Sequence, residues 1–172
     1  MPDNALGSLT EKINSRSCHV GVIGLGYVGL PTMVAVAEAG FKVIGIDTDE
    51  NRVAQLNKGH SYIEDVAHET VGVLTKTERF SATSNFAEVV NFDVILVCVP
   101  TPITQHKEPD MRPMSAAIDG LAQYGRPGHT DRPRHNSHSA PITFMFCRMV
   151  CGNQPGHLFS IGHRHPEVFR FD

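Results

Sequence analysis

The feature that most constrains the fold is a glycine-rich turn at residues 24–29, Gly-Leu-Gly-Tyr-Val-Gly, between two apolar segments. Residues 19–24 are short, apolar and β-branched, which is typical of a buried parallel strand. Residues 27–39 are small and apolar and are followed by a glycine, which indicates a helix with a glycine at its end. A second apolar strand is expected at residues 42–47. This order of strand, glycine turn, helix and strand predicts a βαβ unit.

The position of the turn favours a dinucleotide-binding site over a turn without a ligand. Gly24 allows a tight turn out of the strand, Gly26 lets a pyrophosphate approach the backbone, and Gly29 lets the helix pack closely on the sheet. The backbone N–H groups of Tyr27 and Val28 lie at the start of the helix. Unpaired donors and the helix dipole attract phosphate there.

Two further residues indicate which dinucleotide is bound. Asp47 ends the second strand, 18 residues after Gly29, close to the spacing of about 20 expected for a carboxylate that binds the ribose. Such a carboxylate accepts hydrogen bonds from the ribose hydroxyls and repels a 2′-phosphate, which favours NAD over NADP. Arg52 follows one helical turn later and could contact the same ribose or a phosphate. The alternatives are a helix-capping aspartate and a solvated arginine.

The remaining segments continue the alternation of strands and helices. Strands are expected at 80–83 and 93–99, and a loop with four prolines at 100–113. Helices are expected at 49–57, with Asp49 as the N-cap, and at 62–76, 85–90 and 114–124. The alternation predicts an α/β fold, a Rossmann-like parallel sheet with flanking helices. The sheet is expected to be incomplete. We divide the chain into a flexible leader (1–17), an NAD-binding Rossmann domain (18–128) and an atypical tail (129–172).

The tail differs sharply in composition from the rest of the chain. Residues 129–172 hold six of the ten histidines and five of the ten arginines, but none of the five lysines. We interpret this stretch as a disordered or out-of-frame tail of uncertain structure. A genuine divergent tail is the alternative, in which residues 143–147 could form a strand on the open sheet edge. The spacing of Cys147, Cys151 and the nearby histidines matches no compact zinc finger, so no metal site is predicted.

Charge and hydropathy exclude some other classes of protein. The net charge of −3 gives no basic face for nucleic acid. No run of 18 apolar residues is long enough to cross a membrane, and the polar N-terminus lacks the apolar core of a signal peptide. The four cysteines suggest no disulfide framework. We therefore expect a cytoplasmic protein.

Several motifs together resemble the UDP-glucose/GDP-mannose dehydrogenase family. Residues 24–31, Gly-Leu-Gly-Tyr-Val-Gly-Leu-Pro, are similar to its N-terminal signature. Further similar segments follow in the same order at 45–47, 52–53, 56–59, 61–66 and 98–102. Residues 107–110, Lys-Glu-Pro-Asp, resemble the branch that acts on UDP-N-acetylhexosamines.

The resemblance implies a two-step oxidation of the C6 hydroxyl of a UDP-sugar to a carboxylate, with reduction of two NAD. It implies that Asp47 and Arg52 hold the adenosine ribose and that Pro100 and Thr101 lie beside the cofactor. The predicted cofactor-binding set is Gly24, Gly26, Tyr27, Val28, Gly29, Asp47, Arg52, Pro100 and Thr101. Tyr62 either lines the substrate side or packs in the core.

No catalytic residue is predicted in this chain. The family's catalytic glutamate, lysine and nucleophilic cysteine belong to later segments, and their motifs do not occur here. We therefore expect the NAD-binding portion of a UDP-N-acetylglucosamine or UDP-N-acetylmannosamine dehydrogenase, without activity by itself. A UDP-sugar would be a partner only if the second domain were present, and full-length relatives are expected to be homo-oligomers. The alternatives are a non-catalytic NAD-binding module and the product of a gene fragment.

Overall fold

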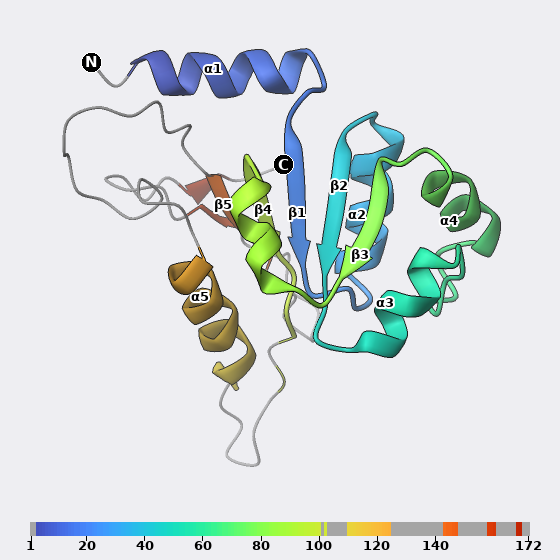
Figure 1. Cartoon of the computed structure of the whole chain (residues 1–172). Helices are drawn as coiled ribbons and strands as arrows, with labels where there is room; N and C mark the ends of the chain where they lie inside the picture. The colour runs from blue at the N-terminus through green and yellow to red at the C-terminus, as the bar shows by residue number, and fades with distance from the viewer. Residues whose placement is uncertain are drawn as a thin grey trace.

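A computed structural model of the chain describes residues 3–100, 102, 110–124, 143–147, 158–160 and 168–169. Its strands form one sheet in the order β3-β2-β1-β4-β5-β6-β7, and Figure 1 labels β1 to β5. The elements are α1 (Asp3–Asn14), β1 (His19–Ile23), α2 (Gly29–Glu38), β2 (Lys42–Ile46), α3 (Glu50–Asn57), α4 (His68–Thr75), β3 (Phe80–Thr83), the 3-10 helix η1 (Phe86–Asn91), β4 (Val94–Val97), α5 (Arg112–Tyr124), β5 (Thr143–Cys147), β6 (Leu158–Ser160) and β7 (Val168–Phe169).

The first four strands form the predicted Rossmann-like parallel sheet. The chain moves outward from β1 to β2 and β3, and β4 then returns to pair with the other side of β1. The direction of strand addition therefore reverses between β1 and β4, and ligands of open α/β sheets bind at such a point. β5 pairs with β4 in parallel and so covers that edge, while β6 and β7 are antiparallel.

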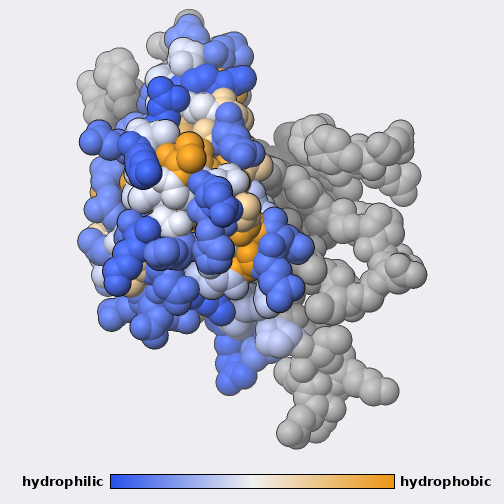
Figure 2. Space-filling view, turned by 90° about the vertical axis from the view of Figure 1, so that its right-hand side faces the viewer, coloured by the Kyte–Doolittle hydropathy of each residue, from blue (hydrophilic) through white to orange (hydrophobic). Residues whose placement is uncertain are grey.

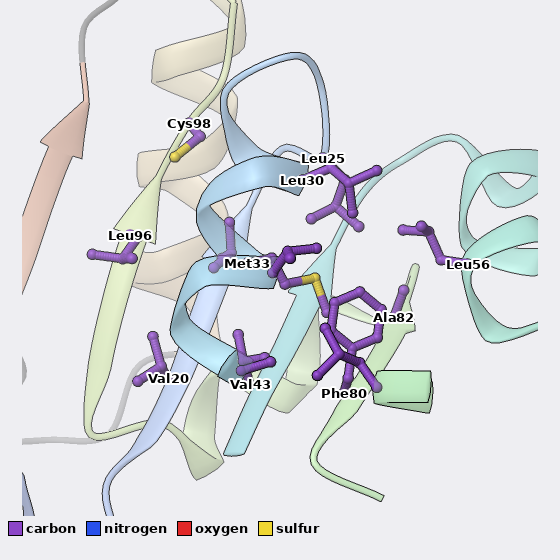
Figure 3. Packing of buried hydrophobic residues seen from close by; sticks show 14 of the residues in the cluster. Val20, Leu25, Leu30, Met33, Val43, Leu56, Phe80, Ala82, Leu96 and Cys98 are labelled. Atoms are coloured by element: carbon purple, nitrogen blue, oxygen red, sulfur yellow. The ribbon is translucent and has the colours of Figure 1, made fainter. Parts of the chain in front are cut away.

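Helices cover both faces of the sheet. On one face, buried residues of α2, α3 and α4 pack against strand residues such as Val20 and Leu96 (Figure 3). On the other face, η1 and α5 pack against Ile23, Ile95 and Val97. The two apolar layers fix the strands from both sides and leave the strand ends accessible. The surface that carries α3 and α4 is mostly hydrophilic, with small apolar patches (Figure 2).

The expected flexible leader contains a helix, which corrects that part of the prediction. Helix α1 lies across the ends of the strands opposite the glycine turn (Figure 1). Leu9 is buried, and the Lys12 ammonium lies 2.7 Å from Asp93 Oδ1. One buried leucine and one ion pair dock a segment whose polar composition suggested disorder. No helix among the described residues is long and apolar enough to span a membrane.

Two other expected helices differ in extent or type. The helix predicted over 62–76 begins only at His68, because residues 61–66 form a loop held by the Ser61 hydroxyl. The helix predicted over 85–90 is the 3-10 helix η1, with Asn85 as its N-cap. The expected N-cap of α3 is confirmed, since the Asp49 side chain accepts from the N–H groups of Asn51 and Arg52.

Candidate dinucleotide-binding cleft

A cleft of about 840 Å³ opens at the carboxyl ends of β1 and β4. One side is formed by the glycine turn and by residues that follow β2. The other side is formed by the segment after β4, by α5 and by Phe86. Of the predicted cofactor-binding residues, the cleft is lined by Gly24, Gly26, Tyr27, Val28, Asp47, Arg52 and Pro100. Gly29 lies behind the turn, and Thr101 lies outside the described residues.

Two glycines of the turn are required by close backbone packing. Gly24 has a φ of +87°, a conformation that L side chains rarely adopt, and a Cβ there would lie 2.8 Å from the Cys98 carbonyl oxygen. A Cβ at Gly29 would overlap the Gly24 carbonyl oxygen and would lie 3.3 Å from Cys98 Cβ. These contacts bring the start of α2 close to the ends of β1 and β4.

The third glycine borders open space instead. A Cβ at Gly26 would meet no atom within 4 Å, and the neighbouring Tyr27 is 77% exposed. Helix α2 follows with Val28 as its N-cap, without a capping side chain and without an acidic residue in its first turn. The first N–H groups of a helix need partners from outside it. An uncapped helix start at the border of a cleft is suited to bind an anion such as a pyrophosphate.

Asp47 is a buried carboxylate at the wall of the cleft. Its Oδ2 accepts a hydrogen bond from the Leu25 N–H at 2.7 Å, and its Oδ1 accepts one from the Asp49 N–H at 2.9 Å. A carboxylate has about four acceptor positions, so two backbone bonds leave capacity for ligand hydroxyls. The alternative of a helix cap does not apply to Asp47, because Asp49 caps α3.

Arg52 lies beside Asp47 at the cleft, although it is half exposed. Its Nη1 is 3.7 Å from Asp47 Oδ2, and its Nε is 3.4 Å from Asp49 Oδ2. The guanidinium also stacks over the Tyr62 ring, 5.5 Å from the ring centroid. Exposed ion pairs add little stability. The main consequence of these contacts is that the cation is kept next to the carboxylate.

Tyr62 lies behind the glycine turn and is not among the residues that line the cleft. Its hydroxyl donates a hydrogen bond to the Leu25 carbonyl oxygen at 2.5 Å. Burial, with the nearby charge of Asp47, raises the pKa of the Tyr62 phenol well above its ordinary value. Sequence reasoning placed Tyr62 on the substrate side or in the core and did not single out Leu25. Only the family-like segment at 61–66 pointed to this region.

The opposite wall of the cleft is mostly apolar. Pro100 and Pro102 follow β4, and Pro113, Ala116 and Ala117 come from the start of α5. Asp110 donates its backbone N–H to the Pro102 carbonyl at 2.7 Å, which joins the two ends of the proline-containing loop. A polar wall and an apolar wall suit a ligand with a charged part and a flat ring system. The side chains of the cysteines and histidines in 129–172 lie outside the described residues.

Comparisons with known proteins give a consistent result. Residues 18–130 match the NAD binding domain of the UDP-glucose/GDP-mannose dehydrogenase family. The UDP-N-acetyl-D-glucosamine 6-dehydrogenase of Pseudomonas aeruginosa is 36% identical over 115 residues, covering 66% of this chain and 26% of that protein. A UDP-N-acetyl-D-mannosamine dehydrogenase of Methanococcus aeolicus is 36% identical over 112 residues, covering 62% of this chain and 25% of that protein.

Solved structures agree with the sequence matches. The crystal structure of a ternary complex of GDP-mannose dehydrogenase from Pseudomonas aeruginosa superposes with a TM-score of 0.61 at 26% identity. The superposition covers 64% of this chain and 26% of that chain. The chain thus spans about a quarter of the length of the curated relatives it matches.

Proposed function

Because the chain belongs to the UDP-glucose/GDP-mannose dehydrogenase family through its NAD binding domain, we propose that the cleft between β1 and β4 is its NAD site. The observation that carries this assignment is the combination of an uncapped helix start with a buried carboxylate on the same wall. Both groups suit a dinucleotide, since the first attracts its pyrophosphate and the second accepts from its ribose hydroxyls.

The individual contacts follow from this placement. Backbone N–H groups of Tyr27 and Val28 donate to the pyrophosphate, which lies over Gly26, where no atom blocks its approach. Asp47 uses its remaining acceptor capacity for the adenosine ribose, and Arg52 borders the same ribose. Pro100 lines the cleft after β4 and lies beside the cofactor. For Thr101, which is outside the described residues, the same role rests on the family resemblance alone.

The reaction and the sugar are proposed from the relatives. When bound, NAD would supply the hydride acceptor for oxidation of the C6 hydroxyl of a UDP-sugar. One oxidation gives the aldehyde, and a second, with addition of water, gives the carboxylate, so two NAD are reduced in total. The sugar is of the UDP-N-acetylhexosamine type, as the names of the similar proteins from Pseudomonas and Methanococcus suggest. The residues of this chain bind and orient the cofactor. Since the motifs of the catalytic cysteine and lysine do not occur in the sequence, we propose that the chain alone oxidises no sugar.

Calorimetric titration with NAD and with NADP tests the cofactor site. We expect NAD to bind more tightly than NADP, because Asp47 repels a 2′-phosphate. We also expect NAD to raise the melting temperature, since it binds only the folded chain. Absence of both heat and a thermal shift at millimolar NAD would refute the site.

A second measurement tests the proposed lack of turnover. NADH formation is followed by absorbance with UDP-N-acetylglucosamine and with UDP-N-acetylmannosamine, each with NAD and the full chain. We expect no rise above the protein-free control. Sustained NADH formation would show that the chain carries a catalytic nucleophile that its sequence motifs do not reveal.

The cellular location and the binding partners of the protein are part of the same proposal. We propose a cytoplasmic location, because the four cysteines of the sequence suggest no disulfide framework of the kind found in secreted proteins. The proposed small-molecule partners are NAD and, in the context of a complete enzyme, a UDP-sugar. The net charge of −3 argues against nucleic acid as a partner.

A further inference from the structure

Leu25 is the residue of the glycine turn that is anchored in the core. Its side chain is fully buried and points between α2 and α3 toward Leu56 (Figure 3). The space for it exists because Gly45 of β2 has no side chain: a Cβ there would lie 2.7 Å from both Leu25 methyl carbons. The side chain therefore fixes the turn at one point, directly before Gly26, which borders open space.

The backbone of Leu25 is held from two sides as well. Its N–H donates to Asp47 Oδ2 at 2.7 Å, and its carbonyl oxygen accepts from the Tyr62 hydroxyl at 2.5 Å. With the N–H, the carbonyl and the side chain all engaged, the peptide plane between Leu25 and Gly26 has a defined orientation. That plane carries the N–H of Gly26 and sets the direction in which the backbone enters Tyr27 and Val28.

The loop that carries Tyr62 is itself firmly attached. The Ser61 hydroxyl accepts from the Ile63 N–H at 3.1 Å and donates to the Ile63 carbonyl at 3.0 Å. The side chains of Ser61, Ile63 and Val66 are buried. The ring of Tyr62 is covered by the Arg52 guanidinium. A phenol is protonated at neutral pH in any case, and burial with the negative charge of Asp47 raises the pKa of Tyr62 further, so its hydroxyl also remains a donor in mildly alkaline solution.

We propose that Tyr62 is a positioning residue, whose hydroxyl orients the glycine turn for the pyrophosphate through the Leu25 carbonyl. The proposal rests on NAD binding in this cleft. It gives a function to the segment at residues 61–66, which contacts the back of the turn. The Tyr62 ring also contacts Arg52, which lies beside Asp47. Tyr62 therefore connects the pyrophosphate side of the site, through Leu25, with the ribose side, through Arg52.

The test compares Tyr62→Phe with Tyr124→Phe in the full chain. Tyr62→Phe removes the hydroxyl and keeps the ring under Arg52. Tyr124, half exposed at the end of α5, is the matched control for loss of a phenol hydroxyl. Hydrogen–deuterium exchange without ligand is measured over residues 24–30, with β1 and β2 as internal references. Calorimetry then gives the dissociation constants of NAD, ADP and adenosine for each variant.

We expect faster exchange at residues 24–30 in Tyr62→Phe, with unchanged exchange in β1 and β2. NAD and ADP should bind about fivefold more weakly, which corresponds to one neutral hydrogen bond. Adenosine, which has no pyrophosphate, should be affected less. Tyr124→Phe should match the wild type in both assays.

Two exchange results would overturn the proposal: unchanged exchange at the turn, or faster exchange spread evenly over the sheet, which indicates general destabilisation. Equal weakening of adenosine and ADP would also contradict it. If the wild type bound no NAD, the proposed function would fail, while the exchange data would still decide whether Tyr62 orders the turn.

Discussion

Replacing Asp47 by asparagine tests whether one carboxylate both holds the glycine turn and binds the cofactor. Its two oxygens accept separate backbone hydrogen bonds, Oδ2 from Leu25 at 2.7 Å and Oδ1 from Asp49 at 2.9 Å. An asparagine offers one carbonyl oxygen and one NH₂ group, so it can accept only one of the two bonds. The other backbone N–H then faces a donor.

The magnitude follows from the burial of the group. Asp47 is only 9% exposed, and an unpaired buried N–H costs about 1–3 kcal/mol. We therefore expect the free energy of unfolding to fall by about 2 kcal/mol, which lowers Tm by about 4–8 °C for a chain of this length. Loss of a charged acceptor for the ribose hydroxyls removes a further 1.5–3 kcal/mol or so from NAD binding, about 10- to 150-fold in Kd.

The assay is calorimetric titration with NAD and NADP, at a temperature well below the melting transition of every variant. Asp47→Asn should bind NAD more weakly and should discriminate less against NADP, because the repulsion of the 2′-phosphate is gone. Asp119→Asn on α5 is the control, since this aspartate is exposed. If Asp47→Asn retained both the wild-type affinity for NAD and the wild-type preference over NADP, Asp47 would not be the residue that binds the ribose.

Three further predictions concern the glycine turn, the ion pair of Asp93 and the tail of the chain. Gly26→Ala should leave the melting temperature nearly unchanged but weaken NAD binding in calorimetry. Gly29→Ala should lower both the melting temperature and the affinity for NAD, because only a Cβ at Gly29 meets backbone atoms. An equal fall in melting temperature in the two variants would contradict this. Burial raises the pKa of Asp93, but hydrogen bonds from the His19 N–H and the Lys12 ammonium outweigh it, and the net pKa is lowered. The resulting stability is complete above the unfolded pKa of about 3.9 and is lost as pH falls through the lower folded pKa. The Tm difference between wild type and Asp93→Asn should therefore shrink below about pH 4, and a constant difference would exclude this explanation. Finally, the family match ends at residue 130, where the composition changes. We expect the nucleotide sequence of the tail, read one base later, to encode a segment such as Leu-Ile-Val-Leu-Asp, and DNA sequencing would show whether it does.

The parts of the fold that could be predicted depend on local patterns. The strands β1 to β4, the cap at Asp49 and the glycine turn each follow from a few neighbouring residues, whose hydropathy period or spacing is directly visible. The placement of Asp47 at the cleft could also be predicted, because a residue directly after a parallel strand lies at the carboxyl edge of the sheet, where ligands bind.

The contacts that could not be predicted join residues far apart in the sequence. Lys12 pairs with Asp93 across 81 positions, and Tyr62 reaches Leu25 across 37. Lysine, aspartate and tyrosine are common at protein surfaces, so nothing in their local sequence distinguishes these pairings from solvated side chains. In α1, Leu6, Leu9 and Ile13 do have a helical spacing. The segment is otherwise polar and mixed in charge, however, and its attachment depends on the distant pairing of Lys12 with Asp93, so the local sequence does not distinguish it from a flexible leader.

In this cleft, the presence of donors for the pyrophosphate and the direction of those donors depend on different residues. The groups assigned to the pyrophosphate are backbone N–H donors, which any residue other than proline can supply, and the Tyr27 side chain is 77% exposed. The direction of these donors depends instead on Leu25, whose environment is built by Gly45, Asp47 and Tyr62 from three other segments. Specificity in the proposed pyrophosphate site thus resides mainly in residues behind the turn. Substitution of Tyr62, behind the turn, should therefore weaken pyrophosphate binding more than substitution of the exposed Tyr27 side chain.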